Sequence, residues 1–92
     1  MAIIRLHILV SGRVQRVNYR GSTQAAAVKE GVSGWVRNLD DGRVEAMVEG
    51  EESAVNRLVQ FMSNGPAGAN VTGLEASPQQ PDGRSDTFEI TR

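Results

Sequence analysis

The stretch that most constrains this chain runs from Ser11 to Arg20, between an alternating apolar segment and an alanine-rich one. The residues before it alternate with a period of two, which predicts a strand with one buried face formed by Ile4, Leu6, Ile8 and Val10. The alanines between Arg20 and Glu30 favour a helix, and Gly31 is well placed to end it. A short loop therefore leads from a strand into a helix whose first N–H groups have no partner within the helix. Such a loop, closed by an arginine, predicts a cradle for a phosphate or carboxylate group.

The rest of the pattern predicts a small mixed domain. We expect the first strand to end at Gly12, and two further strands over 32–37 and 43–49, joined by a connection whose Asp-Gly pair is typical of a hairpin. Residues 50–53 open a second helix that closes at 64–66, and its apolar stripe consists of Val55, Leu58, Val59 and Met62.

The C-terminal third is less regular. Residues 69–76 predict a weaker strand, residues 77–86 a mobile polar loop, and residues 87–90 a last strand with Phe88 and Ile90 facing inward. The resulting order, β-α-β-β-α-β, predicts an α+β fold, a ferredoxin-like sandwich with two helices on one face of a mostly antiparallel sheet.

Composition limits the possible functions. With 92 residues we expect one domain over residues 1–92, and a net charge of −1 argues against a nucleic-acid partner. The chain has no cysteine, which excludes disulfides, thiolate nucleophiles and cysteine metal sites and suits a reducing cytoplasm. Arg5 and His7 interrupt the apolar N-terminus, so we predict neither a signal peptide nor a membrane span. We therefore expect a cytoplasmic monomer without a nucleic-acid or membrane partner.

Two motifs resemble the signatures of the acylphosphatase family. Residues 10–20, VSGRVQRVNYR, are similar to the first signature, and residues 34–38, GWVRN, followed by 41–45, DGRVE, are similar to the second. The resemblance spans essentially the whole chain. It implies the ferredoxin-like fold and hydrolysis of the carboxyl–phosphate bond of a small acyl phosphate, giving a carboxylate and inorganic phosphate. It also implies that the reaction needs no metal or other cofactor and forms no covalent enzyme intermediate.

The resemblance assigns roles to particular residues. The essential arginine of the family corresponds to Arg20 and the essential asparagine to Asn38, and the phosphate-binding loop corresponds to Gln15, Arg16, Val17, Asn18, Tyr19 and Arg20. Chemistry supports these roles, because an acyl phosphate has a good leaving group and the protein must mainly position it and stabilise charge. Arg20 can hold phosphoryl oxygens in a fork, and the amide of Asn38 can hold the attacking water.

Two positions in the loop depart from the family pattern. Arg16 stands where the family has glycine. A positive φ at this position would cost about 1–2 kcal/mol, whereas a negative φ would let Arg16 add positive charge at the rim of the cradle. Asn18 tolerates an unusual backbone angle and can ease that strain. The alternative function is therefore a weakened or inactive domain that acts as an anion-binding or regulatory module.

Simpler structural roles compete for some of these residues. Arg20 could form a surface salt bridge, and Asn38 could serve only as a turn former. We expect Arg37 to pair with an acid on a neighbouring strand, and His7 has no evident partner in the sequence. An RNA-recognition module of the same topology is disfavoured because residues 43–49 contain no aromatic residue on which a base could stack.

Overall fold

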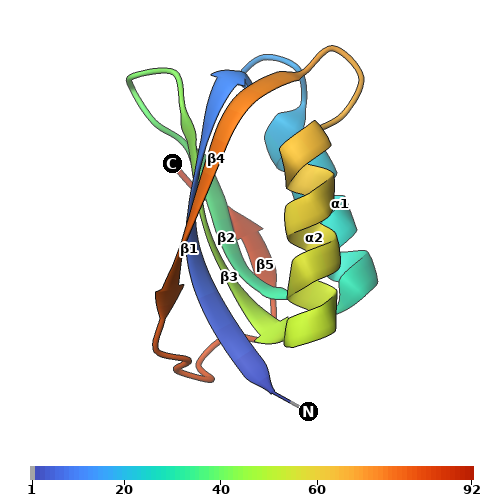
Figure 1. The fold of residues 1–92 in the computed structure, drawn as a ribbon, viewed down its shortest axis with the longest axis vertical. Coiled ribbons are helices and arrows are strands. Elements are labelled where there is room, and N and C mark those ends of the chain that lie inside the picture. Colours follow the sequence, from blue (N-terminus) through green and yellow to red (C-terminus); the bar gives the residue numbers. More distant parts are fainter. Residues whose placement is uncertain (1) are drawn as a thin grey trace.

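The structure, a computed structural model, describes residues 2–92 and contains five strands and two helices. Both helices lie against the same face of the sheet, and its other face carries no helix (Figure 1). In chain order the elements are β1 (Ile3–Arg13), α1 (Tyr19–Glu30), β2 (Ser33–Asn38), β3 (Val44–Glu51), α2 (Glu52–Asn64), β4 (Asn70–Gln79) and β5 (Phe88–Ile90).

The sheet has the strand order β4-β1-β3-β2-β5. Three of its neighbouring pairs are antiparallel, and only β2 and β5 run parallel. The predicted ferredoxin-like α+β fold is confirmed. The predicted order of six elements is one strand short, however, because both C-terminal segments form strands and β5 extends the sheet beyond β2.

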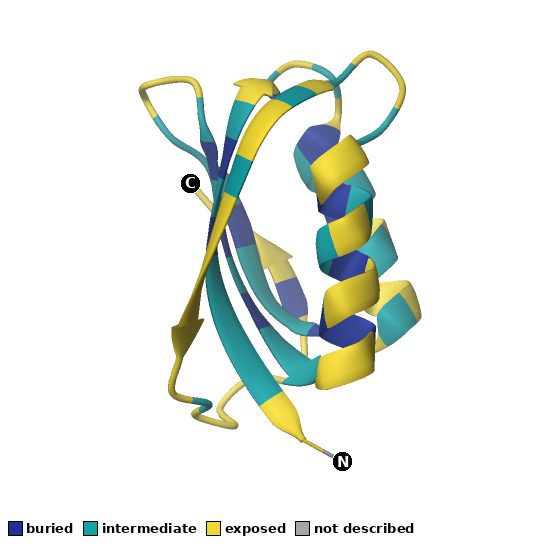
Figure 2. Cartoon of the chain, in the orientation of Figure 1, coloured by how far each residue is buried: buried dark blue, intermediate teal, exposed yellow. Residues whose placement is uncertain are grey.

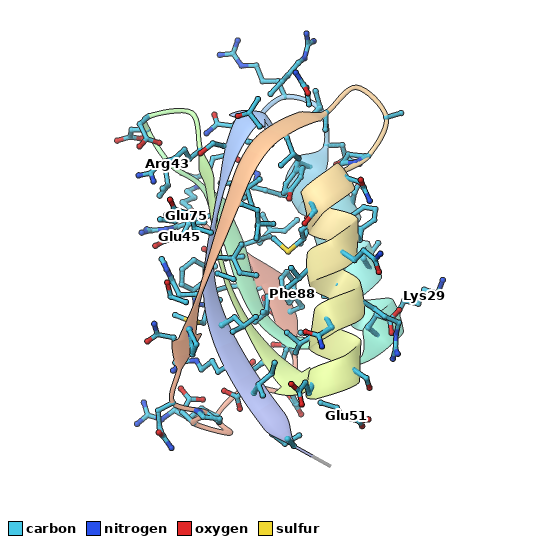
Figure 3. The ribbon with its side chains drawn as sticks, in the orientation of Figure 1. Lys29, Arg43, Glu45, Glu51, Glu75 and Phe88 are labelled. Atoms are coloured by element: carbon cyan, nitrogen blue, oxygen red, sulfur yellow. The ribbon has the colours of Figure 1, made fainter. Side chains whose placement is uncertain are left out.

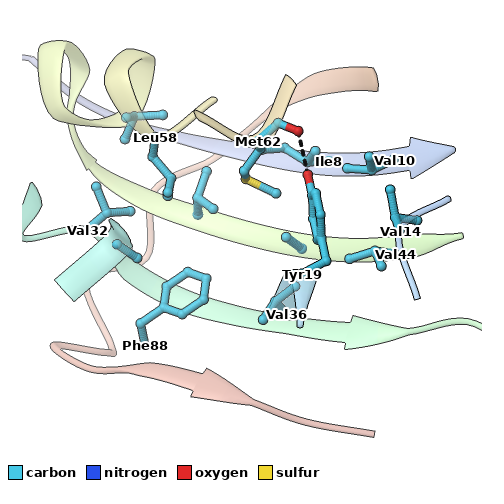
Figure 4. Close-up of a cluster of buried hydrophobic side chains, with 14 of the residues drawn as sticks. Ile8, Val10, Val14, Tyr19, Val32, Val36, Val44, Leu58, Met62 and Phe88 are labelled. Carbon is cyan, nitrogen blue, oxygen red and sulfur yellow. Dashed lines mark hydrogen bonds between the residues drawn. The ribbon is translucent and has the colours of Figure 1, made fainter. Parts of the chain in front are cut away.

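The core lies between the sheet and the helices (Figure 2). As predicted, the buried residues of β3 are Val44, Ala46 and Val48, and the helical stripe of α2 buries Val55, Leu58 and Met62. Phe88 is also buried, and Figure 4 shows it among the labelled side chains of this cluster. Alternation and helical periodicity were sufficient to find these faces because every strand and helix contributes one face to a single apolar layer.

Three details of the prediction are wrong. Ile90 is 41% exposed, because β5 is an edge strand and its end is left open. Residues 77–79 are not loop: β4 continues to Gln79, and Pro78 pairs with Leu6 on an edge where a missing N–H is tolerated.

The third detail concerns Gly12, which does not end β1. The strand continues to Arg13 through a register shift against β4, and Gly12 adopts a φ of 115° there. A Cβ at this position would overlap the carbonyl oxygen of Asn70. Glycine therefore allows β1 to bend at the point where the chain turns toward the loop.

Helix α1 ends as predicted, with Gly31 in the left-handed region and its N–H directed to the carbonyls of Ala27 and Val28. The β1–α1 loop and the β2–β3 turn lie at the same end of the molecule, away from the N-terminus (Figure 1). The fold thus brings the two motifs of the sequence to one edge.

Candidate active site

A hollow of about 170 Å³ opens where the β1–α1 loop meets the end of β2. It is lined by Val14, Arg16, Asn18, Tyr19, Arg20, Gly21, Asn38 and Ile90. Arg20 and Asn38, the two residues expected to carry the chemistry, therefore face the same space. Gln15 and Val17 belong to the predicted loop but do not line the hollow. Ile90 was missed because no local pattern indicates that the end of β5 lies beside Arg20.

The loop that borders this hollow has backbone donors without an acceptor in the described part of the protein. The first hydrogen bond of α1 is donated by the Ser22 N–H to the carbonyl of Asn18, at 3.0 Å. Within residues 2–92, the N–H groups of residues 15–21 donate no hydrogen bond to the protein. Unpaired N–H groups at a helix N-terminus, where the helix dipole is positive, favour an anion.

Arg20 is a half-buried cation in the first turn of α1. No carboxylate among residues 2–92 lies within 4 Å of its guanidinium, whereas Arg5, Arg37, Arg43 and Arg57 each pair with an acid. The salt-bridge role considered for Arg20 therefore finds no partner in the described part of the chain. A cation at the positive end of a helix is unfavourable by itself, and an anion in the hollow would offset that cost.

Asn38 ends β2, opposite Val44 of β3. Its Oδ1 atom is buried and accepts no hydrogen bond from the residues that the structure describes. The turn that follows is closed without this side chain, by the N–H of Leu39 to the carbonyl of Arg43 at 2.8 Å and the N–H of Gly42 to the carbonyl of Leu39 at 3.2 Å. Asn38 lines the polar hollow, and an amide oxygen without a protein partner is free to accept a hydrogen bond from a ligand or water that reaches it.

Gln15 links the loop to the β2–β3 turn. Its Nε2 donates to the carbonyl of Leu39 at 2.8 Å and to the carbonyl of Arg43 at 2.9 Å. Leu39 directly follows Asn38 in the chain, so this side chain fixes the loop relative to Asn38. The sequence gives no signal for this role, because it depends on how far apart the loop and the turn lie in space.

Tyr19 supports the loop from the core side. Its ring is buried, and its hydroxyl donates to the carbonyl of Met62 at 2.6 Å (Figure 4). Burial raises the pKa of this phenol well above its ordinary value. Tyr19 therefore anchors the start of α1 to the end of α2, and its hydroxyl is not free to transfer a proton.

The loop backbone is strained at Arg16. Its φ is 64°, so the first of the two hypotheses for this residue, a positive φ, is confirmed, and a side chain in that region typically costs about 1–2 kcal/mol. Asn18 also has a positive φ, of 57°, which asparagine accepts more readily than most residues. The side chain of Arg16 is exposed at the rim of the hollow.

The opposite face of the sheet holds a separate polar cluster around Glu45. His7 Nε2 lies 2.7 Å from Glu45 Oε2, and Arg37 Nε lies 2.6 Å from Glu45 Oε1, so the pairing expected for Arg37 is confirmed. The hydrogen bond from His7, followed by that from Arg37, holds the pKa of Glu45 below its ordinary value. Figure 3 shows Glu45 projecting away from the helices, so this cluster does not contribute to the hollow.

Two further observations concern ligands and membranes. Across residues 2–92, no group of three or more histidine or carboxylate side chains is arranged to hold a metal ion. Neither helix of the described chain has the length and apolar character that a membrane span requires.

Comparison with known proteins places this site in context. The family model described as Acylphosphatase matches residues 6–90. The chain is 51% identical over 90 residues to an acylphosphatase of Haloarcula marismortui, covering 98% of both chains, and 48% identical to one of Roseiflexus sp., covering 98% of this chain and 97% of the other. The crystal structure of acylphosphatase from Bacillus subtilis superposes with a TM-score of 0.93 at 36% identity, covering 97% of this chain and 99% of that one.

Proposed function

This chain belongs to the acylphosphatase family, and from that premise we propose how its residues hydrolyse an acyl phosphate. The reaction converts a small-molecule acyl phosphate into a carboxylate and inorganic phosphate. We assign substrate binding to Arg20 and the loop amides, and the placement of water to Asn38.

Arg20 and the N–H groups of residues 15–20 bind the phosphoryl oxygens. The support for this assignment is that the guanidinium has no carboxylate partner among residues 2–92 and that the N–H groups have no acceptor there. Charge-assisted hydrogen bonds of this kind are about twice as strong as neutral ones, and a fork can hold two oxygens at once. Because these donors are fixed before the substrate arrives, they stabilise the charge that spreads over the phosphoryl oxygens in the transition state.

Asn38 holds the attacking water through its side-chain amide, and the single observation that carries the proposal is that Asn38 and Arg20 line the same hollow. The water oxygen forms a bond to phosphorus while the bond from phosphorus to the acyl oxygen breaks. The electron pair of the broken bond leaves with the carboxylate, and a proton of the water passes to a phosphoryl oxygen. Asn38 therefore orients the water and need not act as a base.

A comparison of variants tests these roles. We expect Arg20→Ala to lower kcat/KM for benzoyl phosphate by about 10²–10³, the usual loss for one preorganised donor. Asn38→Ala should lower kcat by a similar factor and leave phosphate binding, measured by calorimetry, close to that of the wild type. Arg13→Ala removes an exposed arginine that does not line the hollow and serves as the control.

The outcomes separate the two functions that the sequence left open. A wild-type rate no higher than that of Arg20→Ala and Asn38→Ala would contradict the catalytic assignment. Phosphate affinity that disappears in Arg20→Ala, without turnover by the wild type, would favour the anion-binding module. The relatives named above are acylphosphatases, which favours the enzyme.

The domain organisation, the oligomeric state and the cellular location belong to the same proposal. We infer one domain over residues 1–92, because both helices and the whole sheet share one apolar core. We also infer that it acts in the cytoplasm, which the absence of cysteine supports, and without a nucleic-acid partner, which the net charge of −1 supports. That it acts as a monomer is a further part of the proposal. Size-exclusion chromatography with light scattering would test the oligomeric state.

A further inference from the structure

Arg16 is a second cation at the hollow, and the reaction proposed above does not use its side chain. It lines the hollow together with Arg20, and no carboxylate among residues 2–92 lies within 4 Å of it. Of the nine arginines of the chain, Arg5, Arg37, Arg43 and Arg57 pair with an acid, and within residues 2–92 Arg16 and Arg20 are the unpaired ones that line this hollow. The mouth of this hollow therefore keeps a positive charge that the protein itself does not offset.

The backbone at Arg16 is strained, although the side chain that it carries is exposed. A φ of 64° is unfavourable for a residue with a side chain, and the Arg16 side chain is exposed, so packing in the core does not repay the strain. The positive φ shapes the loop backbone, and the exposed side chain gains no packing in return. A benefit that arises only when a ligand is bound is consistent with these observations.

The size of the hollow indicates which part of a substrate Arg16 can reach. A volume of about 170 Å³ is below the roughly 300–1,000 Å³ of sites that enclose a whole ligand. Arg20 and the loop amides take the phosphoryl group, so the acyl group must lie at the mouth. There it meets the exposed side chains of Arg16 and Ile90.

We propose that Arg16 makes this site selective for acyl phosphates whose acyl group carries a second negative charge, such as a carboxylate. This inference rests on the proposed function. Arg16 acts as a specificity residue: its side chain attracts the distal anion of the substrate, and only its backbone N–H contacts the phosphoryl group. A neutral acyl group loses this attraction and retains only the apolar contact with Ile90.

The test uses two substrates that differ by one charge, benzoyl phosphate and 4-carboxybenzoyl phosphate. The selectivity is the ratio of kcat/KM for the charged substrate to kcat/KM for the neutral one. We expect Arg16→Gln, which keeps a polar side chain and removes the charge, to lower this ratio about three- to fivefold, as is typical of one solvent-screened charge pair. Arg16→Lys should keep the ratio within about twofold, because it retains the charge. Arg13→Gln, an equal change of net charge away from the hollow, should leave it unchanged.

Salt supplies a second readout. Exposed charges are screened within about 10 Å at 0.1 M salt and within about 3 Å at 1 M. The selectivity of the wild type should therefore fall toward that of Arg16→Gln as salt is raised to roughly 1 M. Circular dichroism of each variant would establish that it is folded.

Two results would overturn the inference and leave the proposed function intact. The first is equal selectivity in the wild type and Arg16→Gln while both hydrolyse benzoyl phosphate. The second is an equal loss on both substrates in Arg16→Gln, which would mean that the Arg16 side chain binds the phosphoryl group. Failure of the wild type to hydrolyse either substrate would overturn the inference together with the proposed function.

Discussion

Gln15→Leu is the most informative perturbation of this site, because it cuts the link between the loop and the strand end that carries Asn38. The change keeps the approximate volume of the side chain and removes the Nε2 that donates to the carbonyls of Leu39 and Arg43, at 2.8 and 2.9 Å. Each of these carbonyls keeps a backbone donor, since the Gly42 N–H reaches Leu39 and the Leu39 N–H reaches Arg43. Neither oxygen is therefore left without a partner.

The structure gives the expected size of the effect on stability. Two neutral hydrogen bonds contribute about 0.5–1.5 kcal/mol each, and no full desolvation penalty is added because both carbonyls remain bonded. We expect a loss of about 1.5 kcal/mol in the free energy of unfolding. For a domain of this size, that corresponds to a decrease in Tm of roughly 6–12 °C.

The effect on catalysis should be larger than the effect on binding. Arg20 and the loop amides stay together on one segment, so we expect the dissociation constant for phosphate to change by less than about threefold. Asn38 loses its fixed distance from that segment, and a displacement of about 1 Å can cost on the order of 10² in rate. We therefore expect kcat for benzoyl phosphate to fall about ten- to a hundredfold at a temperature where the variant is folded.

Gln24→Leu is the matched control. Gln24 also donates through its Nε2 to a backbone carbonyl, that of Phe88 at 2.9 Å, but it joins α1 to β5 away from the loop. Its removal should lower Tm by several degrees and leave kcat unchanged. If Gln15→Leu retains kcat within about twofold and loses only stability, as Gln24→Leu does, then the link does not position Asn38 and the reasoning is refuted.

Three further predictions concern stability. Tyr19→Phe removes the buried bond to the carbonyl of Met62, so urea denaturation should show a loss of about 1–3 kcal/mol, whereas kcat of the folded variant should not change. Glu45 has a pKa held below its ordinary value of about 4.5 by His7, so it stabilises the fold above that pH and loses this contribution as the pH falls through its folded-state pKa. The stability gap between wild type and Glu45→Gln, measured by urea denaturation, should therefore shrink below about pH 4.5. Arg16→Gly relieves the strain of a positive φ, but glycine also makes the unfolded chain more flexible. We expect a net gain of roughly 0.5–1 kcal/mol in the free energy of unfolding, and calorimetry should show that Tm rises by a few degrees. An unchanged or lower Tm would contradict the assigned strain.

Much of the fold could be predicted because its signals are local. Alternation in β1 and β3 and the apolar stripe of α2 each show which face is buried, without reference to any partner. The two motifs pointed to Arg20 and Asn38, and the structure brings both to one hollow. The limits appeared at strand ends, where Ile90 is exposed and β4 runs on to Gln79, because pairing with a neighbouring strand decides those positions.

The sequence by itself determined the faces of the strands and helices, the ends of the helices and the residue types available for chemistry, because these follow from periodicity, backbone preference and functional groups. Only the tertiary structure decided that Gln15 reaches the turn beyond Asn38, that Arg16 holds a positive φ at the rim, and that the oxygen of Asn38 is buried without a partner. The contact of Gln15 and the burial of Asn38 depend on distances between segments far apart in the chain, and the φ of Arg16 depends on how the loop closes between β1 and α1. Such distances arise only when the whole sheet and both helices have packed, so no local pattern encodes them.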